Sequence, residues 1–226
     1  MPPETVTAPS AQVLAVCRVH ALREDEGPVG VTAIDKRPVD GPVTVGPLGL
    51  RGDVQADRRF HGGEDKALYA YADEEAALWS AELGKDIPPG LFGENLRTLG
   101  LGTTTAVVGE RWRIGAAVEV EVTSPRIPCS TFARRIDEER WVKRFSDTGR
   151  VGTYLRVIRP GPIEAGHAIT VVHRPAHGVT VGRWFSERSP ADARLLHDAH
   201  AGGLIRLCES MLDAVQTMLA RTDAEG

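Results

Sequence analysis

Short apolar runs separated by turns dominate the first three quarters of the chain. Their length and their content of β-branched residues are typical of strands, and they lie at 13–19, 31–34, 107–115, 151–158 and 169–172. Residues 118–122 alternate strictly between valine and glutamate, which predicts a half-exposed strand with one apolar and one acidic face. Closely spaced glycines and prolines between 38 and 52 favour tight turns and short strands.

Helical patterns are fewer in this part of the chain. The sequence turns helical from Lys66 to Leu83, with Asp73 as N-cap and Gly84 as the end. A second helical stretch covers 132–145. Many short strands with two helices predict a mainly β (α+β) fold, in which a barrel-like domain carries a few helices.

The last fifty residues have a different pattern. Three helices are expected there: one opened by Thr180, one by Ser189 with Pro190 at its first position, and one whose apolar face runs from Leu204 to Leu219. We therefore expect a flexible arm over 1–11, the β domain over 12–175 and a C-terminal three-helix extension over 176–226. We expect no chemistry from the extension.

Size and charge narrow the classes of partner. The chain has 226 residues and a net charge of −4, which argues against a nucleic acid as its main partner. Its basic residues are mostly arginine, which suits phosphate and carboxylate, so a small anionic ligand remains open. Apolar stretches fall far short of the roughly 20 residues of a membrane span, and no signal-peptide pattern is seen, so we expect a soluble cytoplasmic protein.

Cys129 is the first candidate for chemistry. It follows the 118–122 strand in the segment SPRIPC, where two prolines force the chain out of regular structure. Arg126, Arg134 and Arg135 lie close in sequence and favour the thiolate. A free cysteine is equally often a buried apolar side chain, so local chemistry leaves both interpretations open.

The other two cysteines are expected in the core. Cys17 lies in an apolar run and Cys208 on the apolar face of the last predicted helix. Three widely spaced cysteines without a CxxC pair suggest neither a disulfide framework nor a cysteine-rich zinc site.

The polar stretch from 52 to 66 is the second candidate. Gly62 and Gly63 allow close backbone approach to a ligand, and with Arg59, His61 and Lys66 they would suit an oxyanion or phosphate. The alternative is a solvated loop with a turn at the glycine pair. Further along, Asn95 either ties down a loop or reads the edge of a heterocycle.

Several short motifs occur in an order that resembles the MOSC-domain family (molybdenum cofactor sulfurase C-terminal domain), in its YiiM-like group. They are KRPVDGP at 36–42, GD at 52–53, QAD at 55–57, Arg59, HGG at 61–63, DKA at 65–67, Tyr71, FGENL at 92–96, GE at 109–110, RIG at 113–115, PRIPC at 125–129, and GR at 149–150 with Gly152. The resemblance covers roughly 12–175, and the tail resembles the three-helix extension of that group.

The resemblance implies a barrel-like fold that binds the molybdenum cofactor, a pterin-dithiolene with a terminal phosphate. Cys129 would be both the catalytic residue and the metal ligand, because thiolate is a soft ligand that suits such a metal. The cofactor-binding residues implied are Lys36, Arg59, His61, Gly62, Gly63, Lys66, Asn95, Ser124 and Arg126. Pyridoxal phosphate binding is a further property that the family label carries.

The activity implied is the reduction of N-hydroxylated compounds, namely hydroxylamines, hydroxylaminopurines and amidoximes, to amines, as a detoxification. The sequence carries no flavin, haem or iron–sulfur motif, so a separate reductase would supply the electrons. The tail would then serve partner docking or a homodimer. Two alternatives keep the same thiol: a sulfur carrier with a persulfide on Cys129, and a module that stores or hands over the cofactor without turnover.

Overall fold

The computed structural model describes residues 11–27, 29–56 and 62–225. In chain order the strands are β1 (Gln12–Glu24), β2 (Val31–Pro38), β3 (Val43–Gly46), β4 (Gly49–Leu50), β5 (Leu68–Ala72), β6 (Leu96–Leu99), β7 (Arg111–Ile114), β8 (Val118–Pro125), β9 (Thr153–Arg159), β10 (Gly161–Ile163) and β11 (Ile169–His173). The helices are the 3₁₀ turn η1 (Glu64–Lys66), α1 (Asp73–Leu83), α2 (Ser130–Ile136), α3 (Trp141–Asp147), α4 (Val181–Ser186), α5 (Pro190–Ala201) and α6 (Glu209–Glu225).

The main sheet curls into a barrel. Its strand order is β11-β7-β8-β9-β5-β6-β1-β2, antiparallel except for the parallel pair β5–β6. The barrel closes where the start of β1 pairs with the residues before β11. There the amide of Val13 donates to the carbonyl of His167 at 2.9 Å, and Gln12 forms a β-bridge with Ala168. Strand β2 continues from β1 outside the ring, and β10, β3 and β4 form a small second sheet. The mainly β (α+β) prediction is confirmed.

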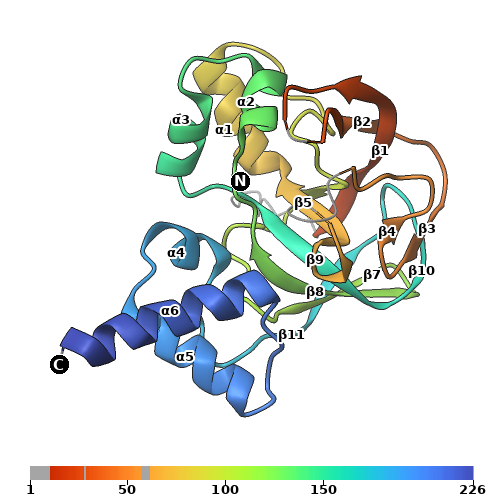
Figure 1. Cartoon of the computed structure of the whole chain (residues 1–226). Coiled ribbons are helices and arrows are strands. Elements are labelled where there is room, and N and C mark those ends of the chain that lie inside the picture. The colour runs from red at the N-terminus through yellow and green to blue at the C-terminus, as the bar shows by residue number, and fades with distance from the viewer. Residues whose placement is uncertain (1–10, 28, 57–61, 226) are drawn as a thin grey trace, which may run out of the picture.

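The helices lie in two groups on the sheet (Figure 1). Helices α1, α2 and α3 gather at one end, over a cluster of buried aromatic side chains. Helices α4, α5 and α6 form the C-terminal extension on another side of the barrel. None of the helices in the described part of the chain is long and apolar enough to cross a membrane.

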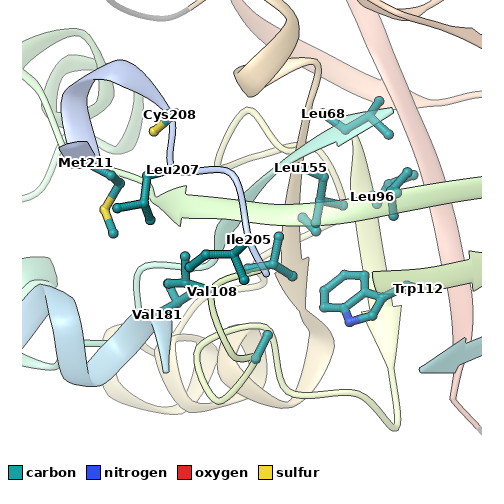
Figure 2. Packing of buried hydrophobic residues seen from close by; sticks show 14 of the residues in the cluster. Leu68, Leu96, Val108, Trp112, Leu155, Val181, Ile205, Leu207, Cys208 and Met211 are labelled. Carbon is teal, nitrogen blue, oxygen red and sulfur yellow. The ribbon is translucent and has the colours of Figure 1, made fainter. Parts of the chain in front are cut away.

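One continuous apolar core joins the barrel to the extension. Figure 2 shows Ile205, Leu207 and Met211 beside Val108 of the barrel domain, and all four are buried. The first two helices of the extension form as the sequence predicts: the hydroxyl of Thr180 caps α4, and Ser189 caps α5. The last helix was predicted too long, because α6 begins only at Glu209 and Leu204, expected on its apolar face, lies before it and is exposed. Packing of this kind stabilises helices that would be marginal alone.

The helix predicted from Lys66 was wrong in its first part. Strand β5 lies there, and helix α1 begins only at Asp73. All five residues of β5 are buried, because one face of the strand packs into the barrel core through Leu68 and Ala70 and the other into the aromatic cluster through Tyr69 and Tyr71. A strand buried on both faces shows no alternation, so its sequence, LYAYA, does not distinguish it from the start of a helix.

Two other predicted elements also differ from the structure. The helical stretch at 132–145 is two helices, α2 and α3, because Asp137 and Arg140 adopt left-handed backbone angles between them. Strand β8 is almost wholly buried instead of half exposed. Its Glu121 is tolerated in the interior because Arg111 donates to the carboxylate at 2.8 Å and Arg156 lies 3.6 Å from it.

Candidate functional site

A cavity of about 290 Å³ lies beside the barrel, next to the group of helices α1 to α3. Its walls come from the hairpin of β1 and β2, from residues 53–56, from the start of β5, from 92–95, from the segment after β8, and from β9. Residues far apart in sequence therefore meet here. Of the site residues predicted, Lys36, Lys66, Asn95, Arg126 and Cys129 line this cavity.

Cys129 lies where the sequence places it, just beyond the end of β8. Pro125 ends the strand and Pro128 keeps the following segment extended, so Cys129 precedes the first residue of α2 with an extended backbone. The side chain is half-buried and faces the cavity wall. Cys17 is different, because burial raises the pKa of its thiol to about 12.

Arg126 is the most unusual side chain of the cavity. Only 5% of it is exposed, and its guanidinium lies over the Phe132 ring, 3.6 Å from the ring centre, and 5.3 Å from the centre of Tyr69. The Nη1 atom is buried, and no described residue accepts a hydrogen bond from it. A buried cation without a carboxylate is costly, so this position favours an anion that enters the cavity.

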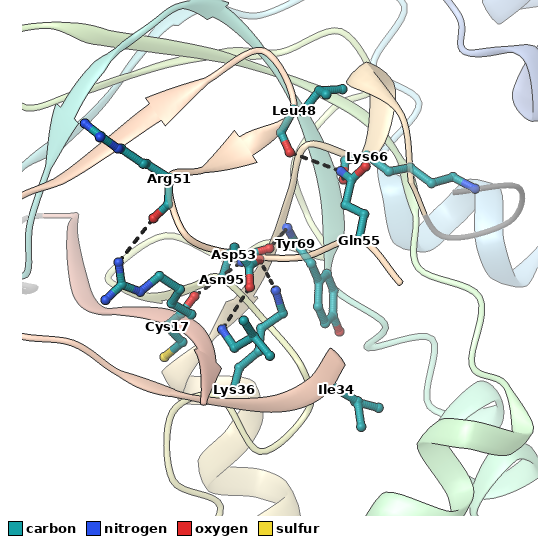
Figure 3. Close-up of polar contacts among 12 residues, drawn as sticks. Cys17, Ile34, Lys36, Leu48, Arg51, Asp53, Gln55, Lys66, Tyr69 and Asn95 are labelled. Atoms are coloured by element: carbon teal, nitrogen blue, oxygen red, sulfur yellow. Dashed lines mark hydrogen bonds and ion pairs between the residues drawn. The ribbon is translucent and has the colours of Figure 1, made fainter. Parts of the chain in front are cut away.

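Asp53 organises the polar wall of the cavity (Figure 3). Its carboxylate forms a close ion pair with Lys36, accepts from Asn95 Nδ2 at 2.7 Å and accepts from the amide of Val19 at 2.8 Å. Lys36 is thereby held at the cavity with its charge balanced. Asp53 was missed as a site residue, although it belongs to the polar stretch that the sequence singles out.

Asn95 has the geometry of a residue that ties segments together. Its Oδ1 accepts from the amide of Tyr69 at 3.1 Å, and its Nδ2 donates to Asp53 and to the carbonyl of Cys17 at 3.3 Å. Three strand and loop segments are joined through this one amide. Of the two interpretations left open by the sequence, the structure favours the architectural one.

Gln55 holds the loop that carries the glycine pair. Its Oε1 accepts from the amide of Gly63 at 2.9 Å, and its Nε2 donates to the carbonyls of Leu48, Gly63 and Lys66 (Figure 3). Lys66 follows at the end of η1, with its ammonium 5.7 Å from the centre of the Tyr154 ring. Arg59 and His61 lie outside the described residues.

Three predicted positions stand apart from the cavity wall. Gly62 and Gly63 are not among the residues that line the cavity, and Gly63 has a φ of 91° that favours glycine. Ser124 is buried in β8 opposite Tyr154 of β9, and no described residue is hydrogen-bonded to its hydroxyl.

The structure adds two tyrosines to the site, Tyr69 and Tyr154. Both line the cavity with their rings 5.6 Å apart. Burial raises the pKa of each hydroxyl, and the nearby charge of Arg126 opposes that effect only in part. Both hydroxyls are therefore protonated at neutral pH. Sequence patterns gave no signal for them, because Tyr69 lies in β5, which is buried throughout, and Tyr154 lies in the buried first half of β9.

Two ion pairs fasten the β1–β2 hairpin to α2, the helix that follows Cys129. The carboxylate of Asp25 accepts from Arg134 at 2.7 Å and from the Thr131 hydroxyl at 2.9 Å. Asp35 accepts from Arg135 at 2.9 Å. Arg134 and Arg135, two of the three arginines near Cys129 in sequence, thus hold α2 against the hairpin. Only the third, Arg126, lines the cavity.

The residues of the cavity fit an anionic cofactor that brings its own metal ligands. Among the described residues, no group of three histidine, cysteine, aspartate or glutamate side chains is placed to hold a metal ion. A single soft ligand, the thiol of Cys129, faces the cavity together with the cations of Lys66 and Arg126. Such a donor set suits a metal already bound by sulfur within an anionic group, with the buried Nη1 of Arg126 left to bind the anion.

Comparison with known proteins identifies the family of the chain. Residues 57–170 match the family model of the MOSC domain. The chain is 34% identical over 150 residues to the uncharacterized protein YflK of Bacillus subtilis (strain 168), covering 66% of this chain and 67% of YflK. It is 36% identical over 147 residues to the protein YiiM of Escherichia coli (strain K12), covering 63% of this chain and 65% of YiiM.

A fungal protein and two solved structures extend the comparison. The chain is 34% identical over 189 residues to a protein of Gibberella moniliformis (strain M3125 / FGSC 7600) named "Reductase", covering 77% of this chain but only 33% of that protein. The crystal structure of YiiM from Geobacillus stearothermophilus superposes with a TM-score of 0.75 at 29% identity, covering 92% and 99% of the two chains. YiiM from Escherichia coli gives 0.65 at 28% identity, covering 80% and 86%.

Proposed function

The chain belongs to the MOSC domain family, and we propose that its cavity binds the molybdenum cofactor and that the loaded protein reduces N-hydroxylated compounds to amines. The compounds meant are hydroxylamines, hydroxylaminopurines and amidoximes. One observation carries the proposal: a half-buried thiol, Cys129, shares a cavity with the buried guanidinium of Arg126, whose Nη1 has no hydrogen-bond acceptor among the described residues. The fungal relative named a reductase supports the reaction class.

The residues of the cavity divide the binding between them. Cys129 would be the protein's ligand to molybdenum, because thiolate is the soft donor that such a metal favours. Arg126 and Lys66 would bind the anionic parts of the cofactor, and Arg126 is the stronger of the two because its burial keeps water away from the contact. Asp53 and Asn95 would act indirectly, by fixing Lys36 and the surrounding segments.

The overall reaction consumes two electrons and two protons: R–NHOH + 2 e⁻ + 2 H⁺ gives R–NH₂ and H₂O. When bound, the cofactor would supply the two-electron redox chemistry for removing the substrate oxygen. The chain itself supplies orientation and a cavity partly shielded from water. The hydroxyl of Tyr154 stays protonated at neutral pH and is available there as a hydrogen-bond donor. The electrons would come from a separate reductase.

The direct test is the cofactor content of protein purified from a host that makes the molybdenum cofactor. We expect about one molybdenum and one pterin per chain, both lost in Cys129→Ser while the far-ultraviolet circular dichroism stays unchanged. Cys208→Ser is the matched control, because that thiol is buried in the extension core and its Sγ lies 3.5 Å from the Ser210 hydroxyl. It should keep both cofactor and turnover.

Two results would count against the proposal. Full molybdenum content in Cys129→Ser would refute the ligand assignment. Folded wild-type protein free of both metal and pterin would refute cofactor binding, and a persulfide on Cys129 would then identify the protein as a sulfur carrier.

A further inference from the structure

We propose that the C-terminal extension braces the cavity loop, residues 62–67, and that Arg206 is a positioning residue for Lys66. The brace itself is independent of the proposed function. Only the consequence for cofactor binding rests on it, because Lys66 is one of the cations assigned to the cofactor.

The first step is the packing of the segment that joins α5 to α6 against the barrel. Ile205 and Leu207 are buried in the core that the barrel shares with the extension (Figure 2). Ile205 sits against Gly109, where an added Cβ would lie 2.5 Å from the Ile205 Cγ2 atom. The neighbouring Leu204 and Arg206 are exposed. The two apolar anchors therefore fix the backbone from which Arg206 projects.

The second step is the contact between Arg206 and the cavity loop. The guanidinium Nη2 of Arg206 donates to Asp65 Oδ1 at 2.9 Å. Asp65 lies in η1, directly before Lys66. A residue 141 positions away in sequence thus holds the turn that carries the cavity lysine.

The third step is a buried arginine that joins the same two partners. Nη2 of Arg156, in β9, donates to the main-chain carbonyl of Arg206 at 2.6 Å, and its Nη1 lies 3.4 Å from Asp65 Oδ1. The hydroxyl of Thr123, in β8, donates to the carbonyl of Asp65 at 2.6 Å. Two barrel strands and the extension therefore converge on Asp65.

Asp65 and Lys66 are successive residues of η1, so fixing Asp65 also fixes the position of Lys66 at the cavity. Asp65 points to the extension while Lys66 reaches the cavity wall, where its ammonium lies 5.7 Å from the centre of the Tyr154 ring. Because successive Cα atoms lie about 3.8 Å apart, a shift of Asp65 moves Lys66 with it. Gln55 fastens the loop from its other side. Arg206 is 60% exposed, so its loss should loosen the loop locally and leave the fold intact.

The test is hydrogen–deuterium exchange of the cofactor-free protein, followed in peptides that cover residues 62–68. We expect Arg206→Ala to speed exchange there about two- to fivefold, as the loss of one exposed ion pair allows. Arg206→Lys should restore most of the protection. Lys143→Ala is the matched control, because the Lys143 side chain is 61% exposed, like that of Arg206, and its ion pair with Asp147 lies far from the loop in sequence and outside the cavity wall.

A dependence on salt separates an ion pair from general loosening. Raising the salt concentration should speed exchange of 62–68 in the wild type and have little effect in Arg206→Ala, because screening acts on a contact that the variant lacks. Unchanged exchange in Arg206→Ala, or an equal change in Lys143→Ala, would overturn the brace.

The loaded protein tests the positioning role. Arg206→Ala should release molybdenum and pterin several-fold faster than either the wild type or Lys143→Ala. Faster exchange without faster release would overturn the positioning of Lys66 and leave the brace standing. If the wild type binds no cofactor, the proposed function fails, whereas the exchange experiment still decides on the brace.

Discussion

The guanidinium of Arg126 lies over the Phe132 ring, 3.6 Å from its centre, in a pocket where no described residue accepts a hydrogen bond from Nη1. This contact joins the segment after β8 to helix α2, on either side of Cys129. Cation–π attraction offsets only part of the cost of burying the charge, so the arrangement is understandable as a site kept for an anion.

Replacing Arg126 should change the stability of the cofactor-free protein and its cofactor binding in opposite directions. Arg126→Met keeps much of the apolar contact with Phe132 and removes the buried charge. We expect the free energy of unfolding of the cofactor-free protein to rise by about 1 kcal/mol, because a desolvated cation is no longer buried. Molybdenum and pterin content should fall to background. Urea unfolding and metal analysis on the same preparation check both parts. A clear loss of stability would show that the contacts of the guanidinium in the cofactor-free state outweigh the cost of burying its charge.

The carboxylate of Asp53 is expected to stabilise the fold through three donors: Lys36, Asn95 and the amide of Val19. In Asp53→Asn the new NH2 group has to face either Lys36 and Asn95, which share one carboxylate oxygen, or the amide of Val19. All three are donors, so a buried contact becomes repulsive in either orientation. We expect a loss of about 2–4 kcal/mol in the free energy of unfolding, measured with urea. Asp40→Asn, at an exposed position near the end of β2, should change it by less than about 0.5 kcal/mol.

A glycine in the small sheet should be irreplaceable for steric reasons. Gly49 has a φ of 110°, and an added Cβ would lie 2.3 Å from the carbonyl oxygen of Ala67, at the cavity wall. Gly49→Ala should therefore cost at least about 3 kcal/mol in stability. Gly41 is the matched control: its φ is 72°, but no atom lies within 4 Å of an added Cβ. Gly41→Ala should cost only about 1 kcal/mol. Equal losses of stability in thermal unfolding would show that the positive φ alone determines the cost of both substitutions.

The hairpin fastening should depend on pH. Burial alone would raise the pKa of Asp25, but hydrogen bonds from Arg134 and Thr131 outweigh it and hold the pKa below its ordinary value. A lowered folded-state pKa stabilises the protein above the unfolded value of about 4, and this stabilisation is lost as the pH falls through the folded value. Asp25→Asn should thus be less stable than the wild type at pH 7, with the difference shrinking towards pH 3.

Urea unfolding of both proteins across this pH range measures the effect. Asp147→Asn serves as the control, because its carboxylate belongs to an exposed ion pair with Lys143. A difference that stays constant from pH 7 to pH 3 would mean that Asp25 acts through packing and not through its charge.

The sequence by itself determined the β-rich fold class, the three C-terminal helices and the place of Cys129. Each rests on a local property: strand-length apolar runs, the caps at Thr180 and Ser189, and the prolines that end β8 before the thiol. Local rules act over a few residues, so they can be read from the order of residues alone.

Tertiary structure decided which side chains join the thiol. Strand β5 cannot be recognised from the sequence, because it is buried on both faces and shows no alternation. Tyr69 and Tyr154 come together at the cavity only through the pairing of β5 with β9. Arg134 and Arg135, near Cys129 in sequence, are taken up by Asp25 and Asp35, whereas Asp53 and Arg206 act on the cavity from distant segments. Charge pairing and burial depend on three-dimensional distance, and the sequence carries no measure of that distance.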